Sequence, residues 1–200
     1  MVMTKIELRR EMKAVLASLN PVEKAFESMS KCVNFIQSDI FKNAGAIYGF
    51  MPMKDEVDIL PVLRTAMQQG KMVFLPKIIE GTCEMEFFRI TDEPNQQTQA
   101  NSWGIYEPKP GLEKYDISDV LENTAGYKIV VLVPGLAFGR DNTRLGRGKG
   151  FYDRFLGELK RKAAEIDRET KPIFCGVCYG AQMVWTVPVE DNDVLVDMVL

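Results

Sequence analysis

Histidine is missing from this 200-residue chain. Its absence excludes the Ser-His and Cys-His nucleophile pairs and every metal site that depends on imidazole ligands. The chain also has only four cysteines, which do not make a disulfide framework at this length and are typical of a reducing compartment. Any chemistry must therefore use lysine, arginine, carboxylates, backbone groups and bound cofactors.

Long apolar runs are missing as well. No stretch approaches the roughly 18 apolar residues that a membrane-spanning helix needs, and the N-terminal segment becomes charged before the apolar core of a signal peptide can form. The formal net charge is -3, so whole-chain electrostatics do not favour nucleic acid or an anionic membrane as a partner. We expect a cytoplasmic protein with neither of these partners.

Hydrophobic residues make up 46% of the chain, enough to bury a core at this length. We expect a single domain over residues 1–200, present as a monomer. Thr4 and Glu7 form a capping box before apolar residues at helical spacing, which predicts a first helix. Asn20 followed by Pro21 predicts a second helix that runs to about Ser38.

Further along the chain, strand and helix patterns alternate. Short apolar runs predict strands at 44–50, at 71–75 with Pro76 as its end, at 85–90 on a sheet edge, at 128–134 and at 173–179. Helical spacing predicts one helix that Gly70 stops and another from Phe151 to about Thr170. The polar segment 91–127 reads as a long functional loop. This order predicts an α/β fold, a layered Rossmann-like domain with a largely parallel sheet between helices.

Basic residues gather in one segment between the strand 128–134 and the helix that begins at Phe151. The segment 139–154 carries five basic and two acidic side chains, so its formal charge is +3 and the rest of the chain carries -6. Loops beyond the carboxyl ends of parallel strands are where α/β sheets bind ligands. The sequence therefore predicts a local anion site in this loop.

Three glycines, Gly146, Gly148 and Gly150, alternate with two basic residues, Arg147 and Lys149. Backbone amides can approach an anion closely in such a loop, and the helix N-terminus that follows adds to the attraction, which favours phosphate. The loop is not a Walker A sequence, because its spacing and its Ser/Thr position differ. A solvated basic loop whose glycines only serve turns is the alternative interpretation.

The same segment resembles a known family. Residues 133–138 (VPGLAF) and 144–153 (RLGRGKGFYD) are similar to the signature of the 5-formyltetrahydrofolate cyclo-ligases, also called methenyltetrahydrofolate synthetases. Further matches occur in the expected order along the chain: residues 5–9, Met51 with 55–57, 103–108, 188–193 and 196–197. The resemblance thus covers essentially the whole sequence.

The resemblance implies two substrates and a metal ion. The residues that it assigns to ATP are Lys5, Arg9, Arg144, Leu145, Gly146, Arg147, Gly148, Lys149, Gly150, Phe151 and Tyr152. Those that it assigns to the reduced folate are Met51, Glu56, Trp103, Arg147, Gly148, Lys149, Gly150 and Phe151. Asp153 and Asp193 would hold Mg²⁺, which takes one or two carboxylates and completes its shell with water and phosphate oxygens.

The implied reaction is an ATP-dependent ring closure in one-carbon metabolism. The formyl oxygen on N5 attacks the γ-phosphorus of ATP, N10 then attacks the activated carbon, and phosphate leaves. Such a ligase needs no protein nucleophile, which agrees with the missing histidine. Lys149, Arg147 and Arg144 are the candidates for stabilising the transition-state charge, with Lys149 first.

Simpler interpretations exist for several of these residues. Lys5 and Arg9 are also what a solvated helix face contains, Asp153 what a first helical turn contains, and Trp103 what a core contains. Cys175 and Cys178 have redox or zinc spacing but lie in a predicted strand without a second pair, so we expect core thiols.

Two positions depart from the family pattern. Gly139 replaces the usual Asp after the Phe, with Asp141 as a candidate substitute, and Asn142 replaces a Gly, which a left-handed turn tolerates. The lost carboxylate keeps open an inactive nucleotide- or phosphate-binding regulatory protein of the same fold. RNA binding through the basic loop is a second alternative, although single-strand binders interleave basic residues with aromatic residues rather than glycines.

Overall fold

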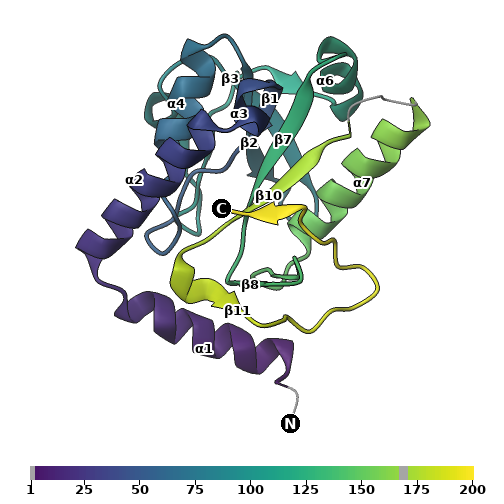
Figure 1. Ribbon diagram of the computed structural model, residues 1–200. Coiled ribbons are helices and arrows are strands. Elements are labelled where there is room, and N and C mark those ends of the chain that lie inside the picture. The colour runs from purple at the N-terminus through teal and green to yellow at the C-terminus, as the bar shows by residue number, and fades with distance from the viewer. Residues whose placement is uncertain (1–2, 167–170) are drawn as a thin grey trace.

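A seven-stranded sheet forms the centre of the protein, whose computed structural model describes residues 3–166 and 171–200 (Figure 1). Its strands, in spatial order, are β12 (Met198–Val199), β10 (Ile173–Val177), β7 (Lys128–Pro134), β1 (Ala44–Tyr48), β2 (Met72–Ile78), β3 (Met85–Ile90) and β6 (Lys114–Tyr115). The pairs from β12 to β2 are parallel, whereas β3 is antiparallel to both neighbours. The predicted α/β class with a largely parallel sheet is confirmed.

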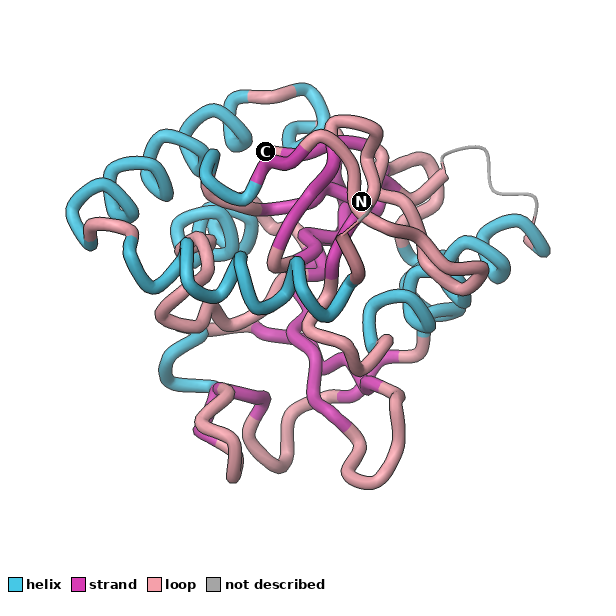
Figure 2. The backbone as a smooth tube through the Cα atoms, turned by 90° about the horizontal axis from the view of Figure 1, so that it is seen from below, coloured by secondary structure: helices cyan, strands magenta, loops and turns pink. Residues whose placement is uncertain are grey.

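Helices cover both faces of this sheet, which explains why its central strands are apolar throughout. The helices are α1 (Lys5–Ser18), α2 (Pro21–Gln37), α3 (Asp39–Lys42), α4 (Leu60–Gln68), α5 (Pro94–Gln97), α6 (Ile117–Asn123) and α7 (Phe151–Glu165). Residues of α1, α2 and α4 belong to one buried cluster, and those of α6 and α7 to another. Figures 1 and 2 show the strands in the middle with helices on either side.

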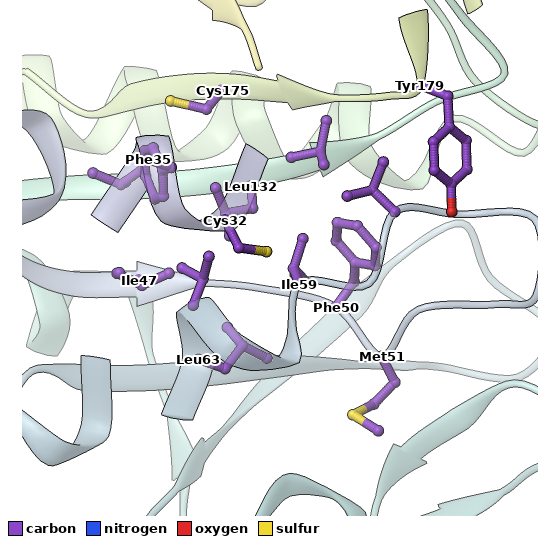
Figure 3. Close-up of a cluster of buried hydrophobic side chains, with 14 of the residues drawn as sticks. Cys32, Phe35, Ile47, Phe50, Met51, Ile59, Leu63, Leu132, Cys175 and Tyr179 are labelled. Atoms are coloured by element: carbon purple, nitrogen blue, oxygen red, sulfur yellow. The ribbon is translucent and has the colours of Figure 1, made fainter. Parts of the chain in front are cut away.

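The first cluster connects the helices to the site described below. Figure 3 shows Cys32 and Phe35 of α2 beside Leu132 of β7, and the cluster continues to Met51, which follows β1. Met51 is only 8% exposed. The backbone that follows β1 is therefore held by the core rather than by solvent-exposed contacts.

Capping residues begin the first two helices where the sequence predicts. The Glu7 N–H donates to the Thr4 hydroxyl at 3.3 Å, and the Thr4 N–H donates to the Glu7 carboxylate at 2.8 Å. The Asn20 side chain accepts the Val22 N–H at 2.8 Å, with Pro21 as the first helical residue. These contacts satisfy amides that have no partner inside a helix.

Pro76 does not end its strand, contrary to the expectation. β2 continues through it to Ile78. Phe74, Pro76 and Ile78 point their backbone groups toward the β1 side, since alternate residues of a strand share a side and the Gly49 N–H donates to the Phe74 carbonyl at 2.9 Å. Pairing with β1 stops at Phe74, so the missing N–H of Pro76 leaves no ladder bond unmade.

The segment 91–127 is not one long loop, and 85–90 is not an edge strand. The segment contains α5, the hairpin of β4 (Thr98–Ala100) and β5 (Tyr106–Pro108), the strand β6 and the helix α6. β6 pairs with β3 and takes the edge position. These strands are two or three residues long, so no alternation of apolar residues marked them in the sequence.

Two remaining expectations concern the end of the chain. α7 ends at Glu165, and its expected end near Thr170 lies outside the described residues. Cys175 and Cys178 are buried free thiols, as expected, and burial raises the pKa of each to about 12. No helix among the described residues is long and apolar enough to cross a membrane.

Candidate active site

One cavity of about 1820 Å³ is lined by every residue that the sequence analysis assigned to ATP, folate or metal. Pockets for one small molecule occupy about 300–1,000 Å³, so this cavity has room for two ligands. Its walls come from α1, the segment after β1, the β2–β3 and β4–β5 hairpins, the glycine-rich loop, α7 and the segment 190–194. Residues remote in sequence are thus brought around one space.

The glycine-rich loop connects β9 (Arg144–Leu145) to α7 and forms the centre of the cavity wall. Gly148 and Gly150 have φ angles of 106° and 72°, which favour glycine strongly. The Arg9 guanidinium covers Gly148, since a Cβ there would lie 3.4 Å from its carbon. Arg9 Nε also donates to the Gly146 carbonyl at 3.0 Å, so α1 holds the loop in place.

A cluster of charges faces the loop from the chain's two ends. The Lys5 ammonium contacts the Asp193 carboxylate at 2.5 Å and Glu190 at 3.3 Å. Lys149 is exposed, and it makes no ion pair or side-chain hydrogen bond with the residues that the structure describes. A free ammonium beside a helix N-terminus is available to a phosphate group.

Arg144 lines the cavity, but its side chain is largely buried within the wall. Its side chain is 3% exposed, and its Nη2 contacts Asp153 Oδ1 at 2.7 Å. Its Nη1 donates to the Pro134 carbonyl at 3.3 Å, and the guanidinium lies 5.8 Å from the Tyr152 ring centre. Arg144 therefore makes its hydrogen bonds within the wall, where it orients Asp153, and its buried Nε has no hydrogen-bond partner among the described residues.

The two carboxylates predicted for magnesium lie in adjacent segments. The Val194 N–H donates to Asp153 Oδ1 at 3.3 Å, and Asp193 precedes Val194. Each carboxylate has a side-chain cation beside it, Arg144 or Lys5. Among the described residues there is no group of three or more metal-binding side chains. This donor set fits Mg²⁺, which uses one or two carboxylates and takes its other ligands from water and phosphate.

Glu56 forms the deep end of the opposite wall. Its side chain is 8% exposed, and burial raises the pKa of its carboxyl. Glu56 Oε2 accepts the Met53 N–H at 3.0 Å, and the Tyr179 hydroxyl donates to its backbone carbonyl at 2.7 Å. Arg147 Nη2 donates to Glu56 Oε1 at 3.2 Å across the cavity. Glu56 is thus a carboxylate that backbone contacts hold in place and that the Arg147 guanidinium partly neutralises.

Trp103 lies at the tip of the β4–β5 hairpin and is 62% exposed. The Asn101 side chain accepts its N–H at 2.9 Å and that of Ile105 at 3.0 Å, which shapes the turn. Such exposure excludes a core role for Trp103. Trp103 lines the same cavity as Glu56 and adds an aromatic side chain to its wall.

Position 139 shows how the chain accommodates its missing carboxylate. A Cβ on Gly139 would lie 2.2 Å from both Asp141 Oδ1 and Thr143 Oγ1. Asp141 accepts the hydroxyls of Thr143 and Thr186, each at 2.6 Å, and these hydrogen bonds lower the pKa of its carboxyl. Asp141 therefore fills the space of a side chain at 139. Asn142 has φ 65°, so the expected left-handed turn is confirmed.

Gly139→Ala should consequently lower the free energy of unfolding by about 1–3 kcal/mol, because its methyl group overpacks this network. Gly157→Ala is the matched control, since a Cβ there meets nothing within 4 Å in the helix α7. It should raise stability by about 0.5–1 kcal/mol. Urea unfolding measures both, and equal stability of the two variants would contradict the assignment of this space to Asp141.

Sequence reasoning missed part of the wall. The lining residues that it did not single out include Phe50, Met53, Pro76, Ile78, residues 81–85, Gly157, Glu158 and Arg161, and Tyr106, Glu107 and Asn192 lie in matched segments but had no assigned role. Arg154, Glu158 and Arg161 lie at spacings of three or four on α7, the helix that the loop begins. That spacing is the signal that could have found Glu158 and Arg161.

The chain is similar in sequence to known proteins. The sequence model of the 5-formyltetrahydrofolate cyclo-ligase family matches residues 2–200. The 5-formyltetrahydrofolate cyclo-ligase of Mus musculus is 31% identical over 194 residues, which are 96% of this chain and 91% of the mouse protein. A probable 5-formyltetrahydrofolate cyclo-ligase of Caenorhabditis elegans is 27% identical and covers 98% and 91%.

Solved structures show the same fold. The 5,10-methenyltetrahydrofolate synthetase of Aquifex aeolicus is similar at a TM-score of 0.75 and 28% identity, over 98% of this chain and 89% of that chain. The synthetase of Mycoplasma pneumoniae is similar at a TM-score of 0.71 and 22% identity, over 98% of both chains.

Proposed function

The chain belongs to the 5-formyltetrahydrofolate cyclo-ligase family, and on that premise we propose that it converts 5-formyltetrahydrofolate to 5,10-methenyltetrahydrofolate while ATP is split to ADP and phosphate. The observation that carries the proposal is the single cavity that holds the glycine-rich loop, Glu56 and Trp103 together. An ATP-dependent ring closure needs both substrates in one space, with the formyl oxygen near the γ-phosphate.

ATP binds along the loop side of the cavity. Lys5, Arg9 and the loop from Arg144 to Tyr152 surround the phosphates, with Lys149 as the free cation. Arg147 and Lys149 stabilise charge on the transferring phosphoryl group. Arg144 acts within the wall, where its contact with Asp153 positions that carboxylate.

The reduced folate binds between Glu56 and Trp103. A pterin is flat and carries amide-like donors, so it suits a buried carboxylate at one end and an aromatic rim at the other. Met51 forms part of the apolar floor, and residues Arg147 to Phe151 border both substrates. This order places the formyl group against the loop.

The ring closure needs no protein nucleophile, because the two substrates supply every atom that forms or breaks a bond. The formyl oxygen attacks the γ-phosphorus and ADP leaves, which gives a phosphorylated iminium-type carbon on N5. N10 attacks that carbon and loses its proton, and inorganic phosphate leaves with the former formyl oxygen. The chain's residues align the reactants, neutralise the phosphates and keep water from the intermediate.

Mg²⁺ belongs to this proposal with Asp153 and Asp193 as its protein ligands. Bound with ATP, it would neutralise phosphate charge. Lys5 would then exchange its contact with Asp193 for one with phosphate, because both cations compete for the same carboxylate. We further propose that the protein acts as a cytoplasmic monomer without nucleic-acid partners. The free buried thiols Cys32, Cys175 and Cys178 support only the reducing compartment in this proposal.

Absorbance spectroscopy tests the reaction directly. Purified protein with 5-formyltetrahydrofolate, ATP and Mg²⁺ should develop the methenyl chromophore, in step with ADP release. The chromophore should be absent with a non-hydrolysable ATP analogue and strongly reduced when a chelator removes Mg²⁺. A protein that binds both substrates but forms no chromophore would instead be the inactive regulatory protein.

A further inference from the structure

Arg147 spans the cavity between the phosphate loop and the folate wall. Its Nη2 donates to Asp55 Oδ1 at 3.0 Å and to Glu56 Oε1 at 3.2 Å, contacts that join segments 91 or more residues apart. The side chains of Arg147, Asp55 and Glu56 are 36%, 24% and 8% exposed. One guanidinium nitrogen is therefore shared by two carboxylates.

In this arrangement the contact between Arg147 and Glu56 competes with the binding of both substrates. Arg147 lies on the loop that faces the ATP phosphates, and Glu56 is the buried acceptor at the folate end. While Arg147 contacts Glu56, it occupies the Oε1 atom that a pterin donor would need. A triphosphate on the loop offers Arg147 a stronger anionic partner, since bidentate phosphate contacts suit a guanidinium.

Asp55 is the second carboxylate that the Arg147 guanidinium contacts. It is the more exposed of the two carboxylates and belongs to the segment whose backbone is set by the Met53 to Glu56 turn. Asp55 is not among the residues assigned to either substrate. Its carboxylate contacts the Arg147 guanidinium beside Glu56.

We propose that Asp55 is a positioning residue that holds Arg147 over Glu56, so that ATP binding releases Arg147 and makes Glu56 available to the folate. This inference rests on the proposed function. It predicts that each substrate tightens the binding of the other, because a coupling between two binding sites is reciprocal.

Isothermal titration calorimetry tests the coupling without turnover. The dissociation constant of 5-formyltetrahydrofolate is measured with and without a saturating non-hydrolysable ATP analogue and Mg²⁺. In the parent protein the analogue should tighten folate binding about 10-fold or more, within the range usual for coupled sites. Asp55→Asn should tighten folate binding without nucleotide and reduce the coupling to about threefold or less, since Arg147 is then held less firmly.

Two further variants separate this role from a loss of charge or of fold. Asp119→Asn removes the same charge from an exposed position on α6, outside the cavity lining, and should keep the parent coupling. Asp55→Glu keeps the charge and should restore most of the coupling. Parent-like coupling in Asp55→Asn, or weaker folate binding with the analogue in the parent, would overturn the inference. A parent protein that binds no folate under either condition would overturn the proposed function itself.

Discussion

Lys149→Ala should lower kcat for methenyl formation by about 10²- to 10³-fold, the usual cost of losing one preorganised charge at a transition state. Lys149 is exposed to the cavity and is engaged by no ion pair with the described residues, so its ammonium is free to follow the transferring phosphoryl group. The structure gives Lys149 no packing role, so the melting temperature should stay close to that of the parent.

Lys160→Ala is the matched control for this variant. Lys160 is also exposed and lies on α7, but outside the cavity lining. Its removal should leave kcat and KM for ATP within about twofold of the parent, because surface charges outside a site contribute little. Chromophore formation under saturating substrates measures both variants. Equal rates for Lys149→Ala and the parent would remove Lys149 from the catalytic mechanism.

Arg144→Ala should lower the free energy of unfolding by about 3–5 kcal/mol, the range for breaking a buried ion pair from one side. The substitution leaves Asp153 without its partner at 2.7 Å and the Pro134 carbonyl without its donor at 3.3 Å. Activity should fall as well, since Asp153 would no longer be held in its orientation. Urea unfolding followed by circular dichroism measures the loss of stability.

The exposed pair of Arg161 and Glu165 supplies the comparison on the same helix. Both side chains are 57% exposed, so Arg161→Ala should change stability by about 1 kcal/mol or less. If Arg144→Ala were no more destabilising than Arg161→Ala, the Arg144–Asp153 contact would have no structural role, and a direct phosphate contact of Arg144 would regain support.

Local sequence signals predicted much of the fold correctly because they act over a few residues. The Thr4 and Asn20 caps satisfy amides within three residues of themselves, so neighbours alone determine them. Pro76 misled the prediction, since its effect depends on whether a strand lies beside it, and β1 has already ended there. The short strands of 91–127 were missed because pairing partners define them.

The sequence by itself determined the α/β class, the helix starts and the glycine-rich loop between a buried strand and α7, because apolar period, capping and backbone freedom are local properties. Only the tertiary structure decided how the site's charges are used. It placed Arg144 against Asp153 and Arg147 against Asp55 and Glu56. It left Lys149 without an ion pair to any residue of 3–166 or 171–200. A side chain's partner depends on which remote segments of the chain fold beside it, and a local sequence pattern does not show which segments those are.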